Sequence, residues 1–195
     1  TIYLKVEGGP GGIILSPLLS GSRDTLQATF DKRYLLQVGA ARWSFFLCLL
    51  LTALSIWLWA QRSTETMFLR YAAMTGLTAV TTSFFFLDYI PYNLHLWLFV
   101  QHAASDWITF FMISYFAMAL EQPWRIVRRI VFAICIAATL AYAVVPAATM
   151  QPLAYGVHAL LSLVVFGLGL RIFYITWRNP NGTRIWFSIA TLGFL

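Results

Sequence analysis

Four polar residues recur along one apolar stretch of the chain at spacings of seven, four and three: His95, His102, Asp106 and Thr109. On a helix that turns 100° per residue these side chains fall within about 60° of one another and form one polar stripe. A charged side chain in hydrocarbon costs roughly 2.5 to 3.5 kcal/mol on insertion scales, so a carboxylate there needs a partner or access to water. We therefore expect Asp106 and His102 to face the interior of a helical bundle, with Asp106 near a polar group on another helix.

Two interpretations of this stripe remain open. In the first, the residues form a pocket that binds a ligand or a proton, and His102 holds Asp106 ionised through a shared hydrogen bond. In the second, the stripe is an interhelical hydrogen-bond lock, which typically contributes about 0.6 kcal/mol in membrane bundles. We favour the lock, and in either case the stripe marks the inward face of its helix.

His158 is a candidate partner for the stripe. It lies in another apolar stretch, with Tyr155 and Ser162 one turn to either side. A single histidine that faces a bundle core is more often structural than ligand-binding. Two histidines on separate helices could ligate a haem or a metal, but no paired histidine motif recurs at a matching depth. The sequence therefore predicts no cofactor, no metal site and no catalytic residue.

The composition excludes an ordinary soluble domain. Hydrophobic residues make up 60% of the 195 residues and charged residues only 10%, against roughly 25% charged residues in soluble domains. A chain so poor in charge cannot cover a surface that faces water. The net charge of +6 does not indicate a nucleic-acid partner, because the arginines lie in short segments between apolar runs, as membrane topology requires.

Six apolar stretches are candidates for crossing a bilayer, which takes roughly 20 apolar residues per helix. Five should be complete helices, and the sixth is cut off at the end of the chain. Their expected bounds are 43–60, 68–87, 94–120, 126–145, 153–174 and 184–195. Residues 34–195 would then form an all-α polytopic membrane bundle.

The arginines alternate strictly between the loops that join these stretches. The loops after the first, third and fifth stretches carry arginines, and the loops after the second and fourth carry none. By the positive-inside rule the arginine-bearing loops face the cytoplasm. Glu121 and Arg125, four residues apart, are expected to form a modest ion pair at one of these turns. The arginines assigned to this side, where they can also contact lipid headgroups, are Arg62, Arg70, Arg125, Arg128, Arg129, Arg171, Arg178 and Arg184.

The amino-terminal segment has a different pattern. Residues 1–8, TIYLKVEG, alternate between apolar and polar side chains, which is typical of a half-buried strand. One or two strands cannot form a stable sheet alone. We therefore expect residues 1–33 to be the end of an extracytoplasmic β-sandwich domain whose remainder lies upstream, so that the chain is an excerpt of a longer protein.

Three stretches resemble the bacterial seven-transmembrane receptors with diverse intracellular signalling modules. Residues 1–18 are similar to the closing strands of that family's jelly-roll domain. Residues 39–73 are similar to its first two helices, and residues 86–130 to its third helix with the flanking loops. The resemblance implies a homodimeric receptor in the bacterial inner (plasma) membrane, with a seventh helix and a histidine kinase or diguanylate cyclase output domain beyond this chain.

We therefore expect the membrane module of a bacterial sensor, which relays a signal from outside to a cytoplasmic output domain. Its expected partners are the lipid bilayer, the upstream β-domain, an unidentified small ligand and a second copy, with no nucleic acid. The alternative is a transporter or a membrane-embedded enzyme. A transporter should show inverted repeats with helices broken at matching positions, and none is evident. An intramembrane enzyme should show a catalytic constellation at one depth, and only Asp106 with His102 comes close.

Overall fold

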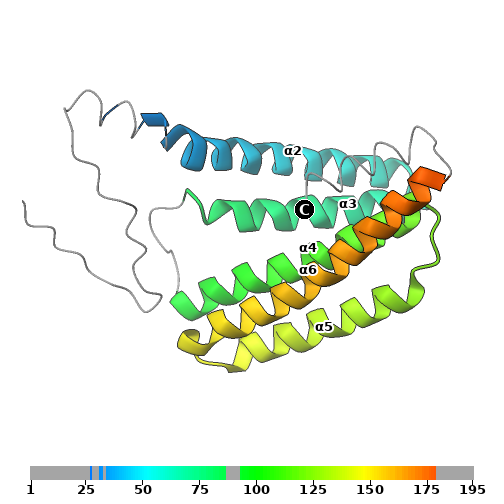
Figure 1. Ribbon diagram of the computed structural model, residues 1–195. Coiled ribbons are helices and arrows are strands. Elements are labelled where there is room, and N and C mark those ends of the chain that lie inside the picture. Colours follow the sequence, from blue (N-terminus) through cyan, green and yellow to red (C-terminus); the bar gives the residue numbers. More distant parts are fainter. Residues whose placement is uncertain (1–26, 28–30, 33, 87–92, 179–195) are drawn as a thin grey trace, which may run out of the picture.

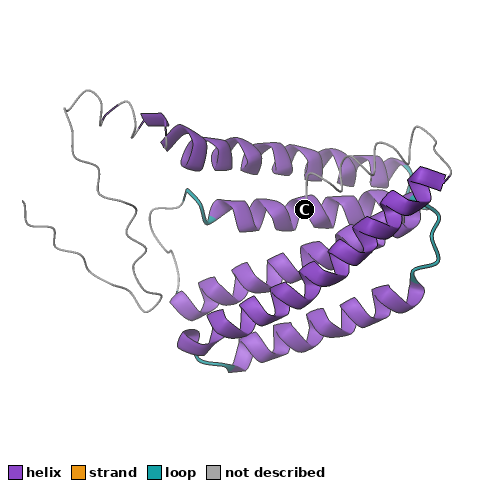
Figure 2. Cartoon of the chain, in the orientation of Figure 1, coloured by secondary structure: helices purple, strands orange, loops and turns teal. Residues whose placement is uncertain are grey.

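The protein is described by a computed structural model, which defines residues 27, 31–32, 34–86 and 93–178. This part of the chain is helical throughout and contains no strand (Figure 2). A short π-helical segment precedes five α-helices, in the order η1 (Leu35–Gly39), α2 (Ala40–Gln61), α3 (Thr66–Ser83), α4 (Leu94–Ala119), α5 (Arg125–Val144) and α6 (Ala147–Arg178). The helices run back and forth along one axis, so the starts of α2, α4 and α6 lie at one end of the bundle (Figure 1).

Helices α2 to α5 occupy the stretches expected from the sequence, but α6 is longer than expected. It begins at Ala147, not near residue 153, and contains Pro152. Met150 and Ala154 are fully buried in a cluster with residues of α4 and α5, so packing holds this first part of α6 helical around the proline. The expected sixth helix at 184–195 and almost all of the expected β-segment at 1–33 lie outside the described residues.

Three helices, α2, α5 and α6, are long and apolar enough to cross a membrane. Helices α3 and α4 fall below that level because they carry more polar residues. In α3 the threonine hydroxyls bond back to carbonyls of the preceding turn, as Thr78 does to Met74 at 2.9 Å, so their polarity is satisfied within the helix. In α4 the polar residues are those of the stripe together with Gln101, Ser105 and Ser114. The Ser105 hydroxyl bonds back to the Gln101 carbonyl at 3.0 Å, whereas His95 and Asp106 of the stripe bond to Val145 and Tyr142.

Helix α4 is the centre of the bundle. It packs against α3, α5 and α6, whereas no contact joins α3 to α5. Nine of its residues are buried, more than in any other helix of the described chain. Helix α5 turns one face toward it at intervals of four, three and four residues: Val131, Cys135, Ala138 and Tyr142. This is the periodicity of an amphipathic helix packed on one neighbour.

The outward faces of the bundle are apolar. Helix α2 buries only Ser55 and packs only on η1 and α3, which leaves large side chains such as Trp43 and Trp57 exposed. Trp177 and Val144 are exposed on α6 and α5 in the same way. Apolar surface of this extent has to be covered by lipid or by further protein, because its exposure to water is unfavourable.

Candidate functional site

The polar stripe of α4 meets α5 and α6 at Asp106, whose side chain is fully buried. Its Oδ2 atom accepts a hydrogen bond of 2.9 Å from the Tyr142 hydroxyl on α5. Its Oδ1 atom lies 3.3 Å from Nε2 of His158 on α6. This carboxylate of α4 thus contacts two other helices, α5 and α6, as expected for an ionisable residue placed inside a bundle. The expectation that Asp106 faces a polar group on another helix is confirmed.

The contact between Asp106 and His158 is an ion-pair contact and not a formed hydrogen bond. The two atoms are close enough to pair, but neither has a partner with hydrogen-bond geometry. The His158 side chain is 31% exposed, whereas Asp106 is inaccessible. The exposed part of the His158 ring therefore lies at the edge of the cluster, and a small rotation of that ring would align or break its contact with Asp106.

His102 is buried, as expected from the sequence. Both of its ring nitrogens lack a hydrogen-bond partner, so the shared bond to Asp106 that belonged to the ligand-pocket interpretation is absent. Its ring centroid lies 5.4 Å from that of His158 and 5.9 Å from that of Tyr142. Most buried polar side-chain atoms in native structures have a hydrogen-bond partner, so this imidazole is an exception. Tyr142, and not His102, donates the hydrogen bond to Asp106.

The two ends of the stripe do not belong to this cluster. Nε2 of His95 lies 2.9 Å from the Val145 carbonyl, which ties the start of α4 to the end of α5. The same helix start is capped by Asn93, whose side chain accepts from the His95 amide at 2.8 Å. Thr109 is half-buried and takes no part in the Asp106 contacts. The stripe therefore divides into a structural tie near the helix start and a buried cluster further in.

We did not identify Tyr142 from the sequence, and we gave too much weight to Tyr155 and Ser162, the neighbours of His158 along α6. Tyr155 and Ser162 are exposed, so they point away from the cluster. The signal for Tyr142 was the inward face of α5, where it follows Cys135 by two turns. Side chains of a helix lean toward its amino terminus, and this brings the Tyr142 hydroxyl down to Asp106. The Cys135 thiol itself donates to the Asp106 backbone carbonyl at 3.4 Å.

The predicted cytoplasmic arginines separate into two groups. Arg62 pairs with Glu65 at 3.5 Å in the α2–α3 turn, and Arg178 lies over the Tyr174 ring. Four others from α3 and α5 line one cavity, which is analysed below: Arg70, Arg125, Arg128 and Arg129. Arg171 is exposed on α6, and Arg184 lies outside the described residues. Four of the predicted arginines thus lie together around one cavity, and Arg62, Arg171 and Arg178 lie apart from it.

The expected ion pair between Glu121 and Arg125 is not formed. Glu121 adopts a left-handed backbone conformation with φ of 54°. Its amide and that of Gln122 donate back to the carbonyls of Met118 and Ala117, which closes the end of α4. The turn between α4 and α5 therefore breaks the continuous helical spacing on which the expected pairing depended.

The Asp106 cluster brings a carboxylate, an imidazole and a phenol hydroxyl together from three helices in a buried site. Electrostatic interactions between such groups are stronger in a buried site than in water. In the described part of the chain no group of three His, Cys, Asp or Glu side chains could hold a metal ion. Comparisons with family models, with characterised proteins and with solved structures give no match to this chain.

Proposed function

We propose that this chain is the membrane module of a signalling receptor in a bacterial plasma membrane. The observation that supports it is the single buried carboxylate, Asp106, that contacts both Tyr142 on α5 and His158 on α6. A change of protonation or of bound ligand at this point alters how three helices attract one another. Such a change shifts the population of helix arrangements, which is how a bundle relays a signal without chemistry of its own.

The proposed topology has α2 to α6 crossing the bilayer, with the amino-terminal segment outside. Helix α4 is too polar to cross alone, but His102 and Asp106 are buried against α5 and α6, so lipid does not meet them. The arginines support the orientation. One end of the bundle carries Arg62 directly after α2, Arg125 at the start of α5 and Arg178 at the end of α6. By the positive-inside rule this end is cytoplasmic.

In the proposed mechanism the outer half of the bundle senses and the cytoplasmic half responds. The Asp106 cluster joins α4 to α5 and α6, and both of these helices continue to the arginine-bearing end. When the attraction between Asp106 and His158 is lost, α6 is free to shift against α4. An output domain beyond the chain, a histidine kinase or a diguanylate cyclase by the resemblance, would respond to that shift in a homodimer.

The test measures helix separation at the cytoplasmic end. Spin labels are placed on the exposed residues Ile126 of α5 and Trp177 of α6, in the full chain with Cys48 replaced by Ser. Electron–electron distances are compared at about pH 5 and about pH 8, on either side of the ordinary histidine pKa. We expect the distance distribution to change with pH in this protein and to stay constant in the Asp106→Asn variant. Identical distributions at both pH values would contradict the receptor mechanism.

A proton transporter is the second candidate, and His102 is the observation that favours it. Its unpartnered ring lies beside the partly exposed His158, so the two histidines could pass a proton inward. Proteoliposomes with an entrapped pH dye distinguish the candidates. Proton flux that requires His102 would favour the transporter, whereas a pH-dependent helix shift without flux would favour the receptor.

A further inference from the structure

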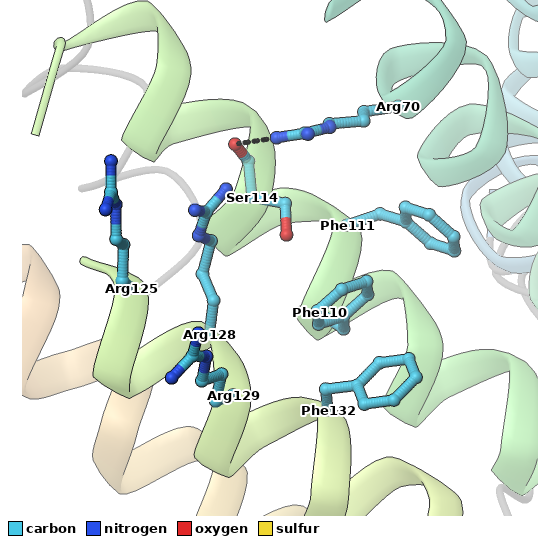
Figure 3. Close-up of a pocket in the computed structure, with 8 residues that line it drawn as sticks. All are labelled: Arg70, Phe110, Phe111, Ser114, Arg125, Arg128, Arg129 and Phe132. Atoms are coloured by element: carbon cyan, nitrogen blue, oxygen red, sulfur yellow. Dashed lines mark hydrogen bonds between the residues drawn. The ribbon is translucent and has the colours of Figure 1, made fainter. Parts of the chain in front are cut away.

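A cavity of about 560 Å³ lies at the arginine-bearing end of the bundle. Helix α4 forms its floor, and α3 and α5 form its two walls, which do not touch each other. The wall from α3 contributes Arg70, and the first turns of α5 contribute Arg125, Arg128 and Arg129. Figure 3 shows the guanidinium groups of Arg70 and Arg128 on opposite sides of Ser114. The cavity therefore concentrates positive charge from two helices that are distant in sequence.

These four arginines have no carboxylate partner among the described residues. Arg70 donates one hydrogen bond of 3.3 Å, to the Ser114 carbonyl, and the buried Nε atom of Arg128 donates none. Arg70 and Arg128 are close enough to repel each other. Partly buried cations that repel one another are costly unless an anion lies between them.

The described residues do not supply this anion. Of the carboxylates at this end of the described chain, Glu65 pairs with Arg62, and Glu121 is exposed in the turn without an ion pair to Arg125. Asp106 is committed to Tyr142 and lies deeper in the bundle. The segment that follows α6, residues 179–195, contains no Asp or Glu. Neither the described residues nor the segment 179–195 therefore offers a carboxylate that neutralises the cavity, which favours an anion bound from outside.

The cavity changes from charged to apolar along the bundle axis. Its arginines are on the first turns of α3 and α5, whereas Phe110, Phe111 and Phe132 line the part nearer the middle of the bundle (Figure 3). Phe132 follows Arg125 by seven residues, a rise of roughly 10 Å along α5. The free amides at the start of α5 also favour an anion at the charged end. A ligand that matches this cavity is anionic at one end and hydrocarbon at the other.

We propose that the cavity binds an anionic phospholipid, with the phosphate between the arginines and one acyl chain along the phenylalanines. Arginine pairs with phosphate through two parallel hydrogen bonds, and the charged end of the cavity is at the level of lipid headgroups in the proposed topology. A soluble anion would use the arginines but leave the aromatic wall unfilled. The lipid accounts for both parts of the cavity, and it requires neither the receptor nor the transporter proposal.

The test measures how many lipids the full chain retains after purification in a neutral detergent. The probes are phosphatidylglycerol and phosphatidylcholine with the same acyl chains, counted by native mass spectrometry. We expect the unaltered chain to retain phosphatidylglycerol selectively, and the selectivity to fall as salt is raised. Arg128→Gln and Arg129→Gln should each weaken retention about fivefold, the effect of one basic residue near an anionic surface. Arg178→Gln, at the same end but outside the cavity, is the matched control and should change retention less than twofold.

Three results would overturn the proposal. Equal retention of the two lipids by the unaltered chain would show that no anionic site exists, and this result needs no variant. An equal loss in the Arg178→Gln control would show that only the general charge of this end attracts the lipid. Competition by inorganic phosphate or glycerol phosphate as strong as that by the whole lipid would assign the cavity to a soluble anion. Circular dichroism of each variant ensures that loss of binding is not loss of fold.

Discussion

Replacing Tyr142 by phenylalanine removes one hydroxyl and tests the buried cluster directly. The Tyr142 hydroxyl is the only hydrogen-bond donor to the Asp106 carboxylate among the described residues, since Oδ1 has none. Hydrogen bonds in membrane bundles average about 0.6 kcal/mol and reach about 1.7 kcal/mol, whereas bonds to charged groups in proteins contribute about 1.5–3 kcal/mol. Because Asp106 is fully buried and water cannot replace the lost donor, we expect a destabilisation near 1.5 kcal/mol.

The assay is reversible unfolding of the full chain in mixed micelles of mild detergent and dodecyl sulfate. The matched control is Tyr155→Phe, because Tyr155 is 62% exposed on the outer face of α6; its free energy of unfolding should stay within about 0.3 kcal/mol of the parent. A double-mutant cycle with Asp106→Leu, a side chain of similar size that cannot accept a hydrogen bond, isolates the pair, and we expect a coupling energy of about 1 kcal/mol.

Two outcomes would refute this reasoning. If Tyr142→Phe unfolds like the parent chain, the bond to Asp106 contributes nothing to stability and the three-helix contact is not a lock. If Tyr142→Phe destabilises the Asp106→Leu chain by the same amount as the parent, the hydroxyl acts through something other than the carboxylate. Either result would also remove the main support for signal relay through this cluster.

Three further predictions follow from the helix packing and the proposed topology. A cysteine at Thr149, in the first turn of α6, should react with an impermeant reagent in intact cells, and a cysteine at Ser63 should not. The reverse pattern would invert the topology. Thr75→Val should cost about 0.6 kcal/mol in the same unfolding assay, because its hydroxyl lies 2.8 Å from that of Thr52 on α2. Thr78→Val is its control, since that hydroxyl bonds only within α3, and equal costs would show that the α2–α3 bond is irrelevant. Gly76→Leu should separate α2 from α3 and lower stability, because a Cβ at residue 76 already lies 3.5 Å from Thr52.

The two proposals fail independently. Loss of lipid selectivity would leave the Asp106 cluster and its helix contacts unchanged, because the arginine cavity lies between α3 and α5. If the helices do not shift with pH, the arginines of that cavity still have no carboxylate partner among the described residues. The lipid proposal would then be unaffected. If both proposals hold, the lipid would contact the start of α5, the same helix that carries Tyr142.

Local properties of the sequence determined the helices and the direction of the polar stripe. Long apolar stretches make helices because only a helix satisfies the backbone hydrogen bonds of a single segment within that segment in hydrocarbon. The spacing of His102 and Asp106 set their common face because 100° per residue is a property of one helix alone. The same local spacing failed at Glu121 and Arg125, where a left-handed turn interrupts the helix.

Only the tertiary structure decided which side chains meet that stripe. Whether Tyr142 or Tyr155 reaches Asp106 depends on the rotation and offset of α5 and α6 against α4, which packing over the whole length of the helices sets. The same holds for the arginine cavity. Arg70 and Arg128 are 58 residues apart in the sequence, and they converge because α4 holds α3 and α5 on either side of it. Periodicity identifies a face within one helix, but the partner of that face is fixed only when all the helices pack together.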